Sequence, residues 1–402
     1  MKRIREIGFG AVVALGLFLF LVGFALRSRA GGAISEPSNP AMTNPDKHAW
    51  DLFLQLNRPA DLSKGRGVPD AAKKIGDDGC TVWETWRLGR GEVYKDDGSQ
   101  PPVWDDGANT ACQGKALEPT NLLILTDAIN QKRKVPHKFQ LLIDTQELTN
   151  ESRMNRATYE FIVTHELYNI EGQQVFVKEA SRTYDKQTRT GSVLSFPEES
   201  MEIKGAWKEL TKEEISQGAA KKYHTATVDG KTYGLTSLHI ITKEVPNWFW
   251  ATFAHKDNRS PAIPDRDTYG MPKELKGTKW ENYKLSGTQV DFTSSVGQPT
   301  RLADTVIEDG FEETSSCMSC HAMASFGPNP GAKREDSLLG KTCSPLPNPS
   351  GREKVKCVVG SPDSSLFGDD KGLKYAQSDF VWSMPFRAKH KAVVSKPQPS
   401  QP

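Results

Sequence analysis

Alternating apolar and polar positions dominate the middle of the chain. In residues 157–167 every second side chain is large and mostly apolar, which predicts a half-buried strand. Val175–Ala180 is expected to pair with this strand across a turn at Asn169–Gly172. The same alternation between Met201 and Trp207 predicts a further strand.

A hairpin and a central strand complete the predicted sheet. Thr225–Val228 and Lys231–Lys243 flank Asp229-Gly230, a dipeptide that favours a two-residue hairpin turn. Asn247–His255 is apolar on both faces, as a strand inside a sheet is. We therefore expect a mainly antiparallel sheet domain over residues 120–260, either a sandwich or a barrel.

The flanking regions predict helices and loops. Asp46 is expected to cap a short helix that ends near Asn57. Residues 58–118 are rich in turn dipeptides, and residues 260–300 are rich in Pro, Gly and Lys, so both are expected to be loops. Residues 302–321 can form a helix.

The N-terminus is typical of an exported protein. A basic start, Met1-Lys2-Arg3-Ile4-Arg5, precedes an apolar run over residues 8–26, close to the length of about 20 residues that crosses a bilayer. The run predicts an uncleaved signal anchor or, if cleaved near residue 30, a signal peptide. In both cases the rest of the chain is expected in the periplasm, tethered to the inner membrane in the first case.

Charge and cysteine content agree with this compartment. The net charge of +2 over 402 residues gives no concentrated basic surface, so no nucleic-acid partner is expected. Outside residues 317–321 the chain has four cysteines. Their grouping suggests disulfides Cys80–Cys112 and Cys343–Cys357, although three pairings are possible and buried thiols are the alternative.

Cys317-Met318-Ser319-Cys320-His321 is the most specific pattern in the chain. Cys-x-x-Cys-His attaches c-type haem: two thiols on one helical turn bond to the porphyrin edge, and the adjacent imidazole binds the iron. With six Cys and eight His, chance gives only about 0.002 copies of the pattern. A redox Cys pair or half of a zinc site is the alternative.

The residues from about 300 to 390 resemble monohaem c-type cytochromes. In that family a Gly-Pro-Asn-like turn follows the haem helix, and the carbonyl of its proline orients the proximal imidazole. A methionine some sixty residues further on binds the iron from the other side. Gly327-Pro328-Asn329 offers the turn, and Met384 lies 63 residues after His321 (384 − 321). The resemblance therefore implies Met384 as the distal ligand, with a buried core methionine as the alternative.

These signals together predict an α+β protein. The expected parts are a signal anchor or signal peptide (1–30), a linker (31–45), a β-rich domain with an N-terminal helix and loops (46–290), a small, mostly α cytochrome c-like haem-binding segment (291–390) and a disordered tail (391–402). His165, His239 and His255 lie in the predicted sheet, where each faces a haem edge or a substrate, or is a hydrogen-bonded core histidine.

The expected function is electron transfer by one covalent haem c, held by Cys317, Cys320 and His321. A haem-ligation machinery and a redox partner protein are the expected partners, with the membrane reached through the N-terminal segment. The alternatives are a haem enzyme of peroxidase or oxygenase type, with an open iron position lined by residues such as His239 or His255, and a haem-based sensor.

Overall fold

A computed structural model describes residues 39–106, 118–119, 148–189, 191, 193–257, 266–304, 315–331, 338, 342, 344–346, 354–356 and 359–392. These residues belong to a compact unit that begins at Asn39, inside the range predicted as a linker. The predicted membrane segment (8–26) and the end of the predicted tail (393–402) lie outside the described residues. Within the described part of the chain, no helix is long and apolar enough to span a bilayer.

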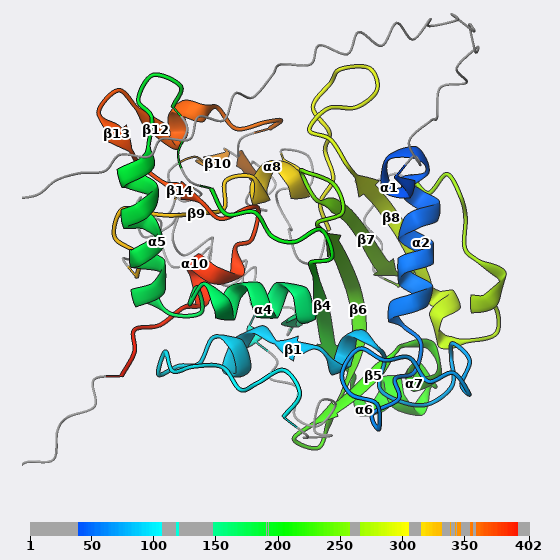
Figure 1. Ribbon diagram of the computed structural model, residues 1–402. Coiled ribbons are helices and arrows are strands. Elements are labelled where there is room, and N and C mark those ends of the chain that lie inside the picture. The colour runs from blue at the N-terminus through cyan, green and yellow to red at the C-terminus, as the bar shows by residue number, and fades with distance from the viewer. Residues whose placement is uncertain are drawn as a thin grey trace, which may run out of the picture. The chain divides into compact units, whose positions relative to one another are not determined.

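One antiparallel sheet forms the centre of this unit (Figure 1). The strand order is β1-β3-β4-β6-β7-β8, while β2 pairs with β3 and β5 pairs with β6. The strands are β1 (Arg87–Leu88), β2 (Glu118–Pro119), β3 (Leu148–Met154), β4 (Met201–Glu209), β5 (Thr225–Val228), β6 (Lys231–Thr242), β7 (Phe249–His255) and β8 (Tyr283–Gln289). The prediction of a mainly antiparallel sheet within an α+β protein is confirmed.

The hairpin and the central strand lie where the sequence places them. β5 and β6 are joined by Asp229 (φ 50°) and Gly230 (φ 77°), the two positive φ values of a type I′ turn. β7 lies between β6 and β8, which explains why six of its seven residues are buried. The predicted strand that begins at Met201 is β4.

The helices are mostly short. They are α1 (Pro40–Thr43), α2 (Pro45–Leu56), α4 (Arg156–Thr164), α5 (Ile170–Thr183), α6 (Lys212–Ser216), α7 (Ala219–Lys222), α8 (Cys317–His321) and α10 (Ser383–Arg387), with 3₁₀ turns η1 (Trp83–Thr85), η4 (Lys273–Leu275), η5 (Lys279–Asn282) and η7 (Ser364–Leu366) and the π turn η2 (Gly89–Val93). Short ladders follow α8: β9 (Ser325–Phe326) with β14 (Ala376–Gln377), β10 (Ser344–Leu346) with β11 (Lys354–Lys356), and β12 (Gly368–Asp369) with β13 (Gly372–Leu373).

The strand predicted over residues 157–167 is wrong, because this segment forms α4. Asn155 caps the helix by accepting a hydrogen bond from the Thr158 amide at 3.1 Å, and Thr158 and Ile162, one turn apart, are buried. The pairing segment 175–180 belongs to α5, and Asn169, expected in a turn, is its N-cap. Tyr159, Ile162 and Val163 also follow the helical i, i+3, i+4 spacing, and the two asparagine caps decide between helix and strand.

Two further boundaries differ from the sequence prediction. Asn44, not Asp46, caps α2, while buried Asp46 accepts hydrogen bonds from Thr268 and Thr288. Of the helix predicted over residues 302–321, the described residues form only α8, while Leu302 and Ser316 form a parallel bridge. Residues 260–300, expected to be loop, contain the sheet strand β8.

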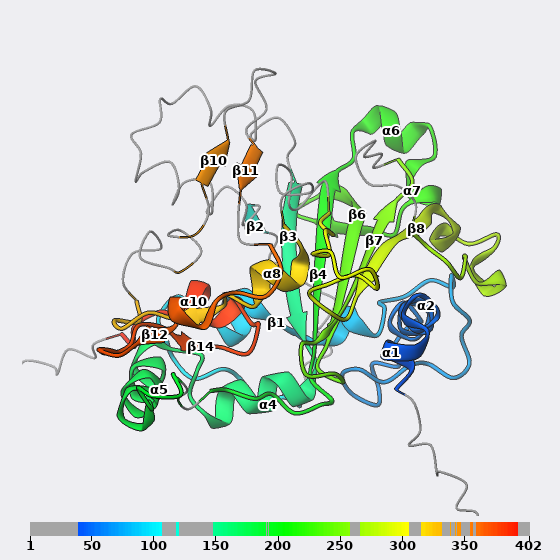
Figure 2. The same ribbon diagram turned by 90° about the horizontal axis from the view of Figure 1, so that it is seen from above.

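The two faces of the sheet differ in chemistry. On one face Phe253 of β7 packs against Trp50 and Phe53 of α2, with ring centroids 5.0 and 4.4 Å apart. Trp250, three residues earlier on the same strand, lies on the opposite face and contacts His321 of α8. Figure 2 shows α2 and α8 on opposite sides of the sheet. The motif is therefore carried by the second face of the sheet.

Candidate functional site

The Cys-x-x-Cys-His sequence forms the single turn α8. Ser316 caps it by accepting a hydrogen bond from the Ser319 amide at 3.1 Å. Gln289, the last residue of β8, accepts from the Met318 amide and donates to Ser316 Oγ, both at 3.1 Å. The edge strand that the sequence did not reveal therefore fixes the position of the motif.

Cys317 and Cys320 are both present as thiols on this turn. The Cys317 thiol is buried and donates to the Leu302 carbonyl at 3.3 Å. Cys320 is half-buried and packs against a second apolar cluster, formed by Met323, Ala324, Leu338, Phe367, Tyr375 and Trp382. The two sulfurs are three residues apart on one turn, as two thioether bonds to one porphyrin edge require.

The ring of His321 is oriented by a backbone carbonyl. Its Nδ1 lies 2.7 Å from the Phe380 carbonyl oxygen, and since a carbonyl can only accept, Nδ1 carries the proton. Burial is the main cause that lowers the pKa of His321 to about 3; the hydrogen bond to the Phe380 carbonyl opposes this shift, and Lys204 and His239 add to it. The ring is therefore neutral at pH 7, and the lone pair on Nε2 is the one that can bind a metal.

The carbonyl that orients His321 differs from the one that the family resemblance implies. Pro328 was expected to supply it from the Gly327-Pro328-Asn329 turn. In the structure Phe380, 59 residues after the histidine, accepts the hydrogen bond. The prediction for Pro328 is wrong because chain folding brings the 379–380 turn against His321, while Pro328 lines a cavity.

The 379–380 turn is held by a buried carboxylate. Asp379 and Phe380 have φ values of 48° and 65°, a conformation that costs energy for side chains larger than glycine. The Asp379 carboxylate accepts hydrogen bonds from Lys243 Nζ (2.7 Å), the Phe196 amide (2.8 Å) and Trp248 Nε1 (3.2 Å). These contacts stabilise the strained turn and so position the Phe380 carbonyl.

The sheet face beside His321 is unusually polar. Trp250 lies on it, with its ring centroid 4.5 Å from that of His321. Cross-strand pairing places Ser152, Lys204, His239 and Thr252 in one row on the same face. Three buried groups of this face have polar atoms without a hydrogen-bond partner: both amide atoms of Asn150, Ser152 Oγ and His239 Nε2.

The structure separates the three sheet histidines of the sequence prediction. His165 is exposed at the end of α4 and bonds to the Phe161 carbonyl. His255 stacks on Tyr223 at 3.7 Å, its Nε2 lies 3.2 Å from the Lys222 carbonyl oxygen, and burial lowers its pKa to about 4. Only His239 lies on the face that contacts His321.

Met384 is fully buried in α10, within the main apolar core. Its carbonyl accepts a hydrogen bond from Gln173 Nε2 at 2.9 Å. Among the described residues, the groups shown acting on the His321 ring come from Trp250, Phe380, Lys204 and His239. Ligation of iron by Met384 stays a prediction.

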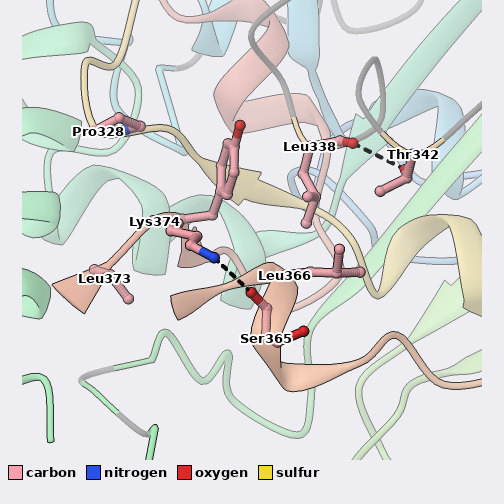
Figure 3. A pocket seen from close by; sticks show the side chains of 8 residues that line it. Pro328, Leu338, Thr342, Ser365, Leu366, Leu373 and Lys374 are labelled. Atoms are coloured by element: carbon pink, nitrogen blue, oxygen red, sulfur yellow. Dashed lines mark hydrogen bonds between the residues drawn. The ribbon is translucent and has the colours of Figure 1, made fainter. Parts of the chain in front are cut away.

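A cavity of about 510 Å³ opens next to the second apolar cluster (Figure 3). Its lining combines apolar side chains with a cation, and consists of Pro328, Leu338, Thr342, Ser365, Leu366, Leu373, Lys374 and Tyr375. Leu338, Leu366 and Tyr375 also belong to the cluster against which Cys320 packs. The apolar wall suits a flat apolar ring such as a porphyrin, whereas the cation of the lining, Lys374, forms an ion pair with Asp369 at 3.0 Å.

The remaining cysteine predictions are only partly visible. Cys80 is in a disulfide. Its predicted partner Cys112, and the predicted pair Cys343–Cys357, lie outside the described residues. Within the described ranges no cluster of three or more His, Cys, Asp or Glu side chains can hold a metal ion.

Comparison with protein-family models, with curated proteins and with solved structures finds no match to this chain.

Proposed function

We propose that the chain is an exported c-type cytochrome that binds one covalent haem and transfers electrons. Cys317 and Cys320 would hold the porphyrin through thioethers, and His321 Nε2 would bind the iron. The observation that carries the proposal is the hydrogen bond from His321 Nδ1 to the Phe380 carbonyl, on the same helical turn as the two thiols. A motif present by accident has no need of an imidazole held in the metal-binding tautomer.

When bound, the haem supplies a metal centre that accepts and releases one electron. The protein's own groups keep the imidazole neutral and oriented: Trp250 packs against its ring, and the Phe380 carbonyl accepts its Nδ1 proton. Together with His321, either Met384, by resemblance, or a histidine of the sheet face would hold the iron. In this proposal residues 291–390 form the cytochrome c-like segment, and a redox partner protein exchanges electrons with it.

Export follows from the same proposal. The apolar run 8–26 serves as an inner-membrane anchor or a cleaved signal, and delivers the chain to the periplasm, where the haem-ligation machinery acts. The net charge of +2 supports no role for nucleic acid.

A haem enzyme with an open distal position is the second candidate. The polar sheet face favours it, because Asn150, Ser152 and His239 present unpaired polar atoms that can bind a substrate of the iron. A haem-based sensor would use the same atoms.

Absorption spectra of the full chain, produced with a haem-ligation system, separate these functions. We expect a low-spin ferric spectrum, rapid reduction by a one-electron donor and no change on adding carbon monoxide or peroxide. His321→Ala should lose the low-spin spectrum, whereas His165→Ala, at an exposed site, should not. A high-spin wild-type spectrum that responds to peroxide would contradict electron transfer and favour the enzyme.

A further inference from the structure

We infer that His239 of β6 supplies the second axial nitrogen to the iron bound by His321, so that the haem is held between two imidazoles. This inference rests on the proposed function, and it names a ligand that the cytochrome resemblance does not contain.

Strand register places His239 on the face that carries the motif. His239 pairs with Lys204 on β4 and with Thr252 on β7, and directly opposed residues in an antiparallel pair share a face. Trp250, two residues before Thr252, shares that face and lies 4.5 Å from the His321 ring. His239 and His321 therefore lie on the same side of the sheet.

His239 has the arrangement of a metal ligand without its metal. Its Nδ1 lies 3.3 Å from the Thr252 hydroxyl, which can accept the Nδ1 proton and leave the lone pair on Nε2. The side chain is 6 % exposed, yet Nε2 has no hydrogen-bond partner. A buried nitrogen without a hydrogen-bond partner destabilises the fold, and a bond to iron would offset this cost.

His321 repeats this arrangement. Each imidazole has Nδ1 held by an oxygen, the Phe380 carbonyl in one case and the Thr252 hydroxyl in the other. An oxygen at Nδ1 fixes both the ring orientation and the tautomer of a ligating histidine.

The contrast with Met384 favours the histidine. A thioether buried among apolar side chains is a satisfied core residue, and Met384 is fully buried in that setting. Its helix is also held by other contacts, since Ser383 Oγ lies 3.1 Å from Glu202 and the Met384 carbonyl accepts from Gln173. The Met384 side chain is therefore fully packed without a metal, whereas His239 Nε2 lacks a hydrogen-bond partner.

The same face offers partners for the polar edge of the haem. Asn150 and Ser152 lie on β3, and Ser152 is in the same cross-strand row as His239, two strands away. At the usual strand spacing this is roughly 10 Å. Both side chains have buried polar atoms without a partner, and both can donate to the carboxylates at the porphyrin edge.

The test uses the full-length chain with its haem attached. Ferric absorption and low-temperature electron paramagnetic resonance of the wild type should show two-imidazole ligation, without a methionine-to-iron charge-transfer band. His239→Ala should become high-spin and bind carbon monoxide, and added imidazole should restore the low-spin spectrum. Met384→Ala should stay low-spin, as should the matched control His255→Ala on the other face of the sheet.

Three results are distinguishable. A methionine charge-transfer band in the wild type, lost in Met384→Ala and kept in His239→Ala, would overturn the assignment of His239 and leave the cytochrome proposal intact. A high-spin ferric spectrum of the wild type would also overturn the assignment of His239. A wild type without covalent haem, matured beside a control cytochrome that is loaded, would instead overturn the proposed function. A two-imidazole wild type whose His239→Ala variant stays low-spin would assign the ligand to another histidine and so overturn the inference; His239→Gln is the second variant should His239→Ala fail to fold.

Discussion

The three residues that the sequence marks most strongly, Cys317, Cys320 and His321, depend on residues that it does not mark at all. Pattern and spacing are sufficient to predict the thiols and the imidazole. The role of Phe380 cannot be predicted from the sequence, because the group that contacts His321 is its backbone carbonyl, and every residue has one. Pro328 was chosen by family resemblance, yet the hydrogen bond to His321 crosses 59 residues and is made only by the fold.

Glu202 predicts a measurable pH dependence at the residue scale. Its carboxyl lies 3.1 Å from Ser383 Oγ, which in turn lies 3.1 Å from the Tyr94 hydroxyl. Burial raises the pKa of Glu202 from 4.5 to about 7, although Ser383 and Arg387 oppose the shift. The folded chain therefore holds a proton between pH 4.5 and 7 that the unfolded chain has lost, so stability falls as pH rises through this window.

The shift corresponds to roughly 3 kcal/mol lost between pH 4.5 and 8. Glu202→Gln cannot ionise, so its unfolding free energy should match that of the wild type near pH 5 and exceed it at pH 8. Denaturant unfolding of both proteins at the two pH values measures the difference. An unchanged difference between pH 5 and pH 8 would show that Glu202 titrates normally.

At the scale of elements, alternation, turn chemistry and apolar content together predicted part of the sheet, namely β4, β5, β6 and β7. The β5–β6 hairpin and β7 were predictable because their turn chemistry and apolar content agree. α4 was predicted as a strand because its short apolar pattern fits two periods, and the caps Asn155 and Asn169 carry the deciding information. β8 has too few apolar residues for a strand to be predicted from the sequence. It is a strand because it pairs with β7.

The 379–380 turn is an element whose role is testable. Asp379 and Lys243 form an ion pair at 2.7 Å with side chains 6 % and 10 % exposed, so Asp379→Ala leaves a nearly buried ammonium without its charge partner. We expect a loss of about 3–5 kcal/mol in unfolding free energy. We also expect a changed ferric spectrum, because the Phe380 carbonyl is no longer held against His321.

Asp379→Asn is the matched variant, because it keeps the size of the side chain and removes only its charge. It should lose less stability and retain more of the wild-type spectrum. A double variant, Lys243→Met with Asp379→Ala, should recover part of the stability because no unpaired charge remains. If Asp379→Ala were as stable as the wild type and spectroscopically identical, the positioning role of Asp379 would be wrong.

At the scale of the whole molecule, the Cys-x-x-Cys-His motif is packed against the sheet rather than carried by a separate unit. β8 holds α8 through Gln289, β7 contributes Trp250, and the segment around Asp379 is tied to Lys243 just after β6. The sequence suggested a haem segment that follows a β-rich domain. What it could not show is that the sheet supplies one wall of the site, because that depends on register across five strands.

The proposed function depends above all on covalent attachment of haem to Cys317 and Cys320. The full chain should be produced beside a control cytochrome in cells with a haem-ligation system, denatured, and examined by gel haem staining and intact mass. We predict that the chain stains and carries the added mass of one haem, and that the double variant Cys317→Ala, Cys320→Ala carries none. A wild-type chain that is colourless and of unmodified mass, while the control cytochrome is loaded, would contradict the account.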